Sequence, residues 1–473
     1  MLRISNYQLP ISNLPTMPTH LSDSLIFRNS WGTDETRAIF DDEPRTRAWL
    51  EILAALAESQ AEAGLIPAEA GRAVAQACRD LPLDAAFFDD VRQGYEATNH
   101  SALGLIMAVQ RRCPGDSGEW VYYGATVQDI TDTWTMMALG RMREILRRDL
   151  GATYAAVIRL AAVQRDTIMP GRTHGQIGLP ITFGFKAAVW ASEYRRHLER
   201  LGEIKPRLGA GQLAGGVGSL SSLGPRGLEL QERFLARLGL RPPEITWTTA
   251  RDVIVEWFQL LTLISGTADK IGQEVYNLQR PEIGEVSEGF VAGTVGSITM
   301  PHKRNPELSL HLGTLARVIR HNAALVAESQ AHDHERDGRS WKAEWAVLAE
   351  TCMAAAKLAA LTHKLIANLV VHPDRMLANL EATKGFVLSE AVMLALAEKV
   401  GKQSAHTLVY ETAMRAHEAG QPLKDAILAE PAITAHLAPA AIEALFDYRR
   451  HVGLCGEMVD RLLSQADLAH STP

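Results

Sequence analysis

The chain has 473 residues, more than one ordinary hydrophobic core holds, so two or three domains are expected. Apolar residues make up 47% of it and aromatic residues only 6%, and runs of β-branched residues are few, which favours helices over sheet. The formal net charge of -7 argues against a general electrostatic attraction to nucleic acid, but it leaves room for a local basic pocket.

Membrane, secretory and metal-binding signals are weak. No stretch reaches the roughly 20 uninterrupted apolar residues of a membrane helix, and residues 1–24 lack the apolar core of a signal peptide. The four cysteines, Cys78, Cys113, Cys352 and Cys455, lie far apart, without a C-x-x-C motif or paired metal spacing. We therefore expect a soluble cytoplasmic protein with buried thiols, no metal site, and neither nucleic acid nor membrane as a partner.

After a polar, proline-marked arm, long helical patterns dominate the chain. Apolar residues at three- and four-residue spacing predict a helix over residues 34–63, which ends at Gly64. Further long helices are predicted over residues 129–166, 180–208, 252–279 and 307–331. Several exceed the usual length of a globular helix, so we expect them to form a bundle that packs against partner subunits.

The pattern predicts an all-α fold of three helical domains. Residues 1–124 form the first domain, and residues 125–372 form a central long-helix bundle that builds the core of a homotetramer. This central domain carries a mobile loop near residues 290–306. Residues 373–473 form a small domain of shorter helices, broken by prolines at Pro422, Pro431 and Pro439.

Four polar segments carry candidate chemistry. Three of them precede helical patterns: Thr98-Asn99-His100, the stretch 120–129 that contains Thr126 and Gln128, and 171–176. Thr126 is placed to cap a helix or to donate to an anion at its N-terminus. The fourth segment, residues 293–306, combines two glycines with Ser297 and the trio Lys303-Arg304-Asn305, a composition that suits an enzyme loop closing over an acidic substrate.

The fourth segment has the order G-S-x-x-M-P-x-K-x-N-P from Gly296 to Pro306. It resembles the signature loop of the fumarase/aspartase superfamily of lyases, and the wording M-P-H-K-R-N-P resembles the adenylosuccinate lyase and carboxymuconate cycloisomerase branches. The other three segments match this superfamily in order and separation from about residue 25 onward. The resemblance implies a cofactor-independent homotetramer, in which different subunits supply Thr126, His174 and the Ser297 loop to each shared active site.

The resemblance also implies roles for single residues. Ser297 matches the catalytic base, and His174 and His100 are the other catalytic candidates, with the identity of the proton donor left open between them. Ser297 can act as a base only when loop closure removes it from water beside positive dipoles and Lys303. The expected substrate-binding residues are Asn99, Thr126, Gln128, Arg172, Thr173, Met300, Lys303, Asn305 and Arg336.

In detail the resemblance is divided between the two branches. Residues 120–133, 171–176 and 334–337 look like adenylosuccinate lyase, whereas residues 341–345 and 380–385 look like the bacterial carboxymuconate cycloisomerases. The residues that hold phosphate and base in adenylosuccinate lyase are replaced here by Ser30-Trp31, Ala250 and Trp341-Lys342. Adenylosuccinate is therefore disfavoured as the substrate, and the histidine at 174 favours elimination over lactone chemistry.

The leading hypothesis is a lyase that releases fumarate from a 2-substituted succinate of the N-substituted aspartate type. Anti elimination would proceed through an aci-carboxylate, a dianion that the enzyme must stabilise. The alternatives are a 3-carboxy-cis,cis-muconate cycloisomerase, adenylosuccinate lyase proper, and an inactive structural relative. Val127 and Ile298 stand where the superfamily usually has hydroxyl residues, so we expect a carboxylate cradle with fewer side-chain donors.

Overall fold

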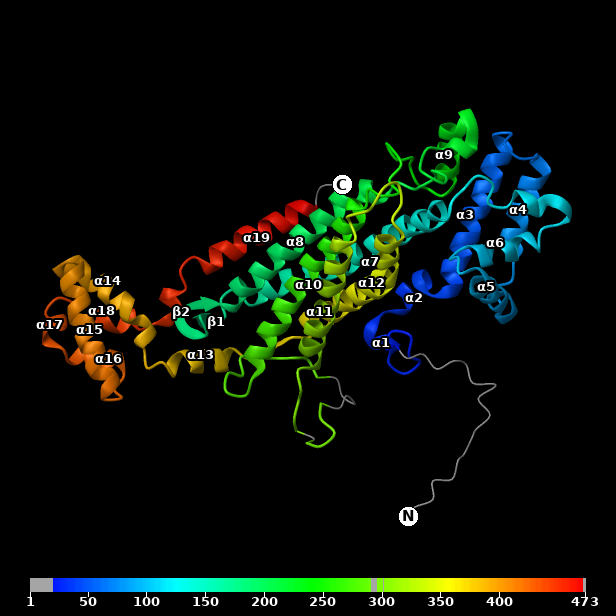
Figure 1. Cartoon of the computed structure of the whole chain (residues 1–473). Helices are drawn as coiled ribbons and strands as arrows, with labels where there is room; N and C mark the ends of the chain where they lie inside the picture. Colours follow the sequence, from blue (N-terminus) through cyan, green and yellow to red (C-terminus); the bar gives the residue numbers. More distant parts are fainter. Residues whose placement is uncertain (1–19, 291–295, 301, 471–473) are drawn as a thin grey trace, which may run out of the picture. The chain divides into compact units, whose positions relative to one another are not determined.

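The computed structural model of the chain describes residues 20–290, 296–300 and 302–470, and it is built almost entirely of helices (Figure 1). The predicted all-α class is confirmed. Within the described residues there are also two small antiparallel sheets, each of two strands, which the sequence did not predict. Their strands are β1 (Ile168–Thr173), β2 (Gln176–Thr182), β3 (Val286–Ser287) and β4 (Val370–Val371).

Four long helices follow the predicted ranges closely: α7 (Val127–Val163), α8 (Phe183–Leu208), α10 (Asp252–Gln279) and α11 (Glu307–Glu328). A fifth long helix, α12 (Gly338–Ala367), was not predicted. On α10 the large apolar side chains recur every three or four residues, and Trp257, Phe258, Leu261 and Ile264 are all at most 1% exposed. This spacing places them on one face of the helix, so burial of that face stabilises it.

The first part of the chain folds into shorter helices: α1 (Arg28–Trp31), α2 (Asp34–Phe40), α3 (Asp42–Glu62), α4 (Ala68–Asp80), α5 (Ala85–Thr98), α6 (Leu103–Gln110) and the 3-10 helix η2 (Gly115–Trp120). The helix predicted over 34–63 is thus two helices, because Asp41 between them has an extended backbone. Thr33 caps α2 by accepting from the Thr36 N–H. Helices α3 and α4 approach closely, since a Cβ on Gly71 would lie 2.4 Å from that of Ala61.

Two further elements, η3 (Ser221–Arg226) and α9 (Gly227–Arg237), lie between α8 and α10. The last part of the chain contains α13 (Pro373–Glu381), η4 (Phe386–Leu388), α14 (Ser389–Val400), α15 (Lys402–Glu418), α16 (Leu423–Ala429), α17 (Pro431–Thr434), α18 (Pro439–Leu445), η5 (Tyr448–His451) and α19 (Cys455–His470). Helices α14 to α18 enclose a core of their own, which includes Val392, Val409, Ile427 and Ile442. Prolines begin α17 and α18.

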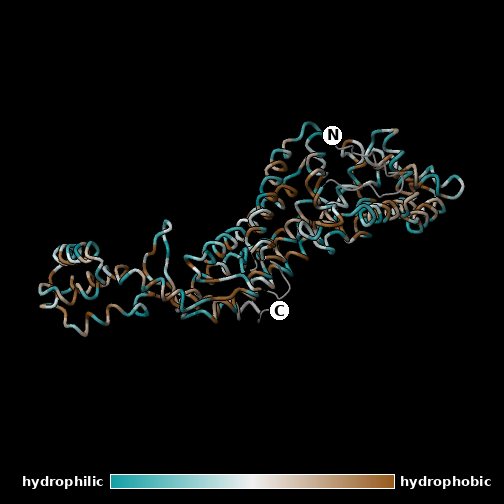
Figure 2. Tube along the Cα trace, turned by 90° about the horizontal axis from the view of Figure 1, so that it is seen from below, coloured by the Kyte–Doolittle hydropathy of each residue, from teal (hydrophilic) through white to brown (hydrophobic). Residues whose placement is uncertain are grey.

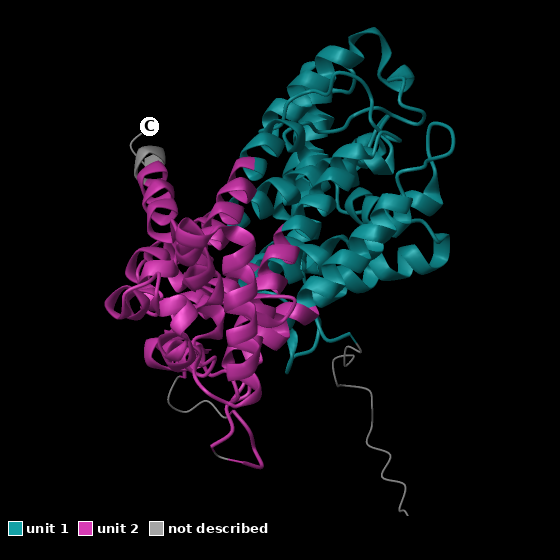
Figure 3. Ribbon diagram, turned by 90° about the vertical axis from the view of Figure 1, so that its left-hand side faces the viewer, with its two compact units in different colours: residues 1–147, 200–263, 315–358 teal, residues 148–199, 264–314, 359–473 magenta. Residues whose placement is uncertain are grey.

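The contacts divide the chain into two compact units, shown in teal and magenta in Figure 3. Unit 1 comprises residues 1–147, 200–263 and 315–358, and unit 2 comprises residues 148–199, 264–314 and 359–473. Each of the five long helices contributes residues to both units. The three-domain division along the sequence stays a prediction, with its boundaries beside the starts of α7 and α13.

Helix α12 is long and apolar enough to cross a membrane, but 61% of its most apolar window is buried within the protein. Such burial is typical of a core helix. Along the chain, hydrophobic and hydrophilic residues are interspersed (Figure 2), as in helices that bury one face.

Candidate active site

The Ser297 loop leads from β3 into α11. Residues 293–295 and Pro301 of the predicted signature lie outside the described residues, so its mobility stays a prediction. Ser297 is half-buried, and its hydroxyl oxygen accepts a hydrogen bond from the Met300 N–H over 3.2 Å. A Cβ on Gly296 would lie 2.6 Å from the Lys303 carbonyl oxygen, so only glycine permits the loop to fold back on itself here.

The same loop carries the other predicted residues Met300, Lys303 and Asn305. Lys303 is exposed, Asn305 is half-buried and Met300 is 48% exposed. Ile298, which stands in place of a hydroxyl residue, is 97% exposed in this structure. Of the loop side chains expected to stabilise a dianion, Lys303 therefore lies at the surface and Asn305 is partly buried.

Glu288 anchors the end of the loop at the start of α11. Its carboxylate accepts from the backbone N–H groups of Leu308 and Ser309 over 3.1 and 2.8 Å. A carboxylate at a helix N-terminus satisfies free N–H donors and complements the helix dipole.

His174 occupies the tip of the β1–β2 hairpin. The strands pair Thr173 with Gln176, and the two residues between them have positive φ, 53° at His174 and 76° at Gly175. Two positive φ angles define a type I′ turn, which matches the twist of the two strands. Thr173 and His174 are exposed, so the hairpin presents both side chains to solvent.

Arg172 holds the hairpin in place. Its guanidinium makes two hydrogen bonds to the Glu285 carboxylate, over 2.8 and 2.6 Å, and the Glu285 side chain is fully buried. The Asn379 amide donates to the same carboxylate over 2.7 Å. The guanidinium of Arg172 is thus engaged in positioning the hairpin that carries His174, and its predicted contact with substrate stays a prediction.

Thr126 and Gln128 lie at the start of α7, where both are buried. The Asp129 carboxylate accepts from the backbone N–H groups of Thr126, Ala214 and Gly215, over 2.8, 2.7 and 3.2 Å. These bonds fasten the loop around residues 214–215 to the first turn of α7. Burial raises the pKa of Asp129 to about 6, even though the three N–H donors act to lower it.

Arg336 contacts this helix start from the segment before α12. Its Nη1 donates to the Thr126 hydroxyl over 2.8 Å. Its Nε and Nη2 are buried and have no hydrogen-bond partner among the described residues. These two atoms form the side of the guanidinium that binds a carboxylate through two parallel hydrogen bonds, so Arg336 is held ready for an anion.

A buried ion network lies next to Gln128. Arg251 contacts the carboxylates of Asp132 and Glu344, at 2.7 and 2.5 Å, and all three side chains are at most 5% exposed. Although burial acts to lower it, these two carboxylates hold the pKa of Arg251 above its ordinary value. The Trp341 Nε1 donates to Asp132 over 3.2 Å, so the tryptophan that replaces a serine of adenylosuccinate lyase belongs to this network.

Two polar groups beside the network lack partners. The Nε2 of Gln128 donates to Asp132 and to the Thr248 carbonyl, whereas its Oε1 is buried without a hydrogen-bond partner among the described residues. The same holds for both ring nitrogens of His332. Burial, together with the nearby Arg251 charge, lowers the pKa of His332, which favours the neutral form of its ring.

Asn99 and His100 lie at the end of α5, and both are exposed. Asn99 ends the helix in the left-handed conformation, with φ of 50°. Within the described part of unit 1, no hydrogen bond links these two side chains to Thr126, Gln128 or Arg336.

Positive φ outside glycine occurs at six described residues. Three of them, Asn99, Tyr122 and His174, lie in three of the four polar segments, and a fourth, His334, begins the stretch 334–337 that resembles adenylosuccinate lyase. Such conformations are retained where the surrounding structure enforces them, often at functional sites.

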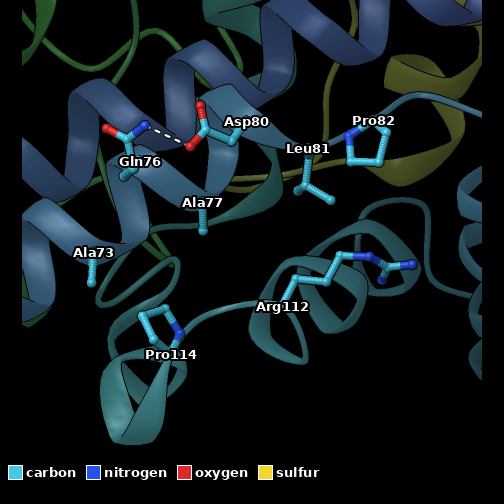
Figure 4. A pocket seen from close by; sticks show the side chains of 8 residues that line it. All are labelled: Ala73, Gln76, Ala77, Asp80, Leu81, Pro82, Arg112 and Pro114. Atoms are coloured by element: carbon cyan, nitrogen blue, oxygen red, sulfur yellow. Dashed lines mark hydrogen bonds between the residues drawn. The ribbon is translucent and has the colours of Figure 1, made fainter.

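Neither the surface hollow nor any metal-binding cluster in the described part of the chain adds to the candidate site. A surface hollow of about 560 Å³ lies between α4 and the residues after α6, lined by Ala73, Gln76, Ala77, Asp80, Leu81, Pro82, Arg112 and Pro114 (Figure 4). None of the predicted site residues lines it. Among the described residues, no group of three or more His, Cys, Asp or Glu side chains is arranged to hold a metal ion.

Sequence reasoning missed Asp129, Glu285, His332 and the Arg251 network. Asp129 had a detectable signal, because an acidic residue three positions after Thr126 is typical of a helix start. The other three are recognisable only from contacts that join distant parts of the chain.

The structure shows an all-α protein with a partly unpaired arginine at a helix start and a serine-bearing loop, and comparison with known proteins identifies its family. Residues 28–319 match the lyase family, and residues 385–462 match the adenylosuccinate lyase C-terminus. The chain belongs to this lyase family and is a carbon-heteroatom lyase of the fumarase/aspartase superfamily.

Two relatives are N-acetyl-S-(2-succino)cysteine lyases. The protein of Enterococcus italicus is 42% identical over 95% of this chain and 98% of its own length, and that of Dickeya dadantii is 39% identical over the same shares. Among solved structures, the 3-carboxy-cis,cis-muconate lactonizing enzyme of Pseudomonas putida has a TM-score of 0.87 and 30% identity, over 94% of this chain and 99% of that one.

Proposed function

We propose that this lyase cleaves the carbon-sulfur bond of N-acetyl-S-(2-succino)cysteine, giving fumarate and N-acetylcysteine. The observation that carries the proposal is the 42% and 39% identity, over nearly the full length, to two lyases of that name. The exposed position of His174 fits a thiol leaving group. A thiol, with a pKa of about 8.5, leaves more readily than an amine and therefore needs less help from a proton donor.

The residues would divide the reaction as follows. Ser297 removes a proton from the carbon next to one carboxylate, and Lys303, Asn305 and Arg336 stabilise the resulting dianion. The carbon-sulfur bond then breaks, its electron pair leaves with sulfur, and a double bond forms between the two central carbons. His174 or His100 supplies the proton that converts the thiolate into the free thiol.

We further propose a cytoplasmic, cofactor-independent homotetramer with shared active sites. The long helices expose apolar side chains that a monomer leaves in water, namely Val189, Leu263, Tyr276, Leu310 and Leu325, which are 38 to 50% exposed. Exposed apolar surface of this kind marks subunit interfaces. Sedimentation velocity tests the proposal, and a stable, active monomer would overturn it.

The substrate assignment is tested by comparing kcat/KM for N-acetyl-S-(2-succino)cysteine, an N-substituted aspartate, adenylosuccinate and 3-carboxymuconate. We expect the thioether to react fastest, with fumarate and free thiol appearing in equal amounts. Ser297→Ala serves as the matched control for contaminating lyases. A higher kcat/KM for adenylosuccinate or for an aspartate derivative would assign a nitrogen leaving group.

The cycloisomerase reaction is the second candidate, since the run Trp341-Lys342-Ala343-Glu344-Trp345 resembles that branch. The structural similarity of this chain to the Pseudomonas putida lactonizing enzyme covers 94% of the chain. Lactone formation from 3-carboxymuconate without any fumarate release from the thioether would favour it.

A further inference from the structure

The start of α7 and the segment before α12 bring together three side chains with unused hydrogen-bonding atoms. They are the Oε1 of Gln128, both ring nitrogens of His332, and the Nε and Nη2 of Arg336. The two segments are joined by the Arg336–Thr126 bond and by the bond from Trp341 to Asp132. The unused atoms therefore belong to one region of unit 1.

The orientation of Gln128 is fixed by its partners. Its Nε2 faces two acceptors, the Asp132 carboxylate at 3.1 Å and the Thr248 carbonyl at 3.2 Å. A flipped amide would set Oε1 against these two acceptors, so Oε1 must face away from them. Since the Gln128 side chain is fully buried, this acceptor is costly to leave unpaired.

His332 adds a hydrogen-bond donor to the acceptor that Gln128 offers. It lies within electrostatic range of Asp132 and Arg251, the ion pair that Gln128 also contacts. A neutral imidazole offers one N–H donor and one acceptor. Together with the Gln128 Oε1, the pair presents two acceptors and one donor.

We propose that His332 and Gln128 form a subsite for the acylamino group of the leaving thiol, beside the carboxylate-binding Arg336. A secondary amide offers both an N–H donor and a carbonyl acceptor, which this pair of side chains matches. A free ammonium offers donors only and would leave the imidazole N–H unpaired. The inference rests on the proposed function, and it makes His332 a residue that determines specificity for N-acylated substrates.

The test compares two thioethers that share the succinyl group and the leaving-group carboxylate. One is N-acetyl-S-(2-succino)cysteine, and the other is S-(2-succino)-3-mercaptopropionate, which lacks the acylamino group. The measured quantity is the ratio of their kcat/KM values. We expect His332→Leu to lower this ratio about 10-fold, because a site built for a hydrogen bond loses selectivity when its partner is removed.

Other variants separate recognition from structure. His332→Gln keeps a donor and an acceptor and should restore most of the ratio, whereas His332→Phe keeps a planar ring without them and should behave like His332→Leu. Asp333→Asn is the matched control, since it alters an exposed neighbour whose ion pair with Arg339 is at the surface. Its ratio should equal that of the wild type.

The outcomes distinguish the two proposals. Suppose the wild-type enzyme acts on both thioethers but the ratio is unchanged in His332→Leu and His332→Phe. This result, which includes an equal loss of activity on both thioethers, would overturn the subsite and leave the proposed function intact. Wild-type enzyme that releases no fumarate from either compound would overturn both proposals.

Discussion

Arg336 donates a hydrogen bond from Nη1 to the Thr126 hydroxyl over 2.8 Å, joining residues 210 positions apart in the sequence. The bond holds one end of the guanidinium and leaves its Nε and Nη2 side unpartnered among the described residues. A guanidinium fixed in this way binds a carboxylate with little further loss of side-chain freedom.

Thr126 and Arg336 should therefore act as a unit. Arg336→Lys replaces the planar donor pair with a single ammonium and should lower kcat/KM about 100-fold. Thr126→Val should cost about 10-fold, because the guanidinium loses its support. Steady-state kinetics of the double variant should match Arg336→Lys alone, and effects that simply add would contradict the coupling.

Replacing the serine should affect turnover alone. Ser297→Ala is expected to lower kcat by about 10² to 10⁴-fold while KM stays near wild type, because the hydroxyl is needed only to remove the proton. Lys303→Met should weaken binding and turnover together, since its charge complements both ground state and transition state. Substantial turnover by Ser297→Ala would move the role of base to His100 or His174.

His174 can be changed without disturbing its turn. Asn-Gly is the preferred sequence of a type I′ turn, so His174→Asn should keep the thermal unfolding midpoint of the wild type. If His174 protonates the leaving thiol, the variant should lose about 100-fold in kcat on an alkyl thioether and much less on an aryl thioether. An equal loss on both thioethers would assign His174 an orienting role.

The Arg172–Glu285 pair should matter for stability. Arg172→Met leaves the buried Glu285 carboxylate without its cationic partner and should lower the free energy of unfolding by about 3 kcal/mol. Arg172→Met combined with Glu285→Gln should recover part of this loss, because no charge then remains buried. Urea unfolding measures both, and a single variant as stable as wild type would show that the pair is dispensable.

The pH dependence of stability should carry a signature of Asp129. Its pKa is raised from 3.8 to about 6 on folding, so the folded state binds the proton more tightly, and this contribution to stability is lost as pH rises from about 4 to about 6. Relative to Asp129→Asn, which does not titrate, wild type should lose about 1 to 2 kcal/mol between pH 5 and pH 7.5. Parallel pH profiles of the two proteins would contradict the raised pKa.

Four of the five long helices were predicted, because their stability comes from a periodic apolar face that the sequence shows, whereas α12 was missed. The predicted range 252–279 coincides with α10. The β1–β2 hairpin was not predicted, because Met169-Pro170-Gly171 shows no strand alternation and its turn depends on positive φ at His174. The sequence suggested a helix from residue 180, whereas β2 extends to Thr182.

The candidate site was predictable in its residue types but not in its contacts. Thr126, Gln128 and Arg336 were identified by resemblance, and the structure brings them to one region of unit 1. The engagement of Arg172 by Glu285, 113 residues away, has no local signal. The same is true of His332, which is singled out by unpaired ring nitrogens within electrostatic range of Arg251 and Asp132 rather than by a motif.

The central claim is that this lyase eliminates a thiol from a 2-thiosuccinate. Proton NMR of N-acetyl-S-(2-succino)cysteine incubated with the wild-type enzyme tests it most directly, with Ser297→Ala as the control. We expect the fumarate vinyl signal and the N-acetylcysteine signals to grow in equal amounts with the wild type, and not with the variant. An unchanged thioether in the presence of wild-type enzyme that turns over another succinate derivative would contradict the claim.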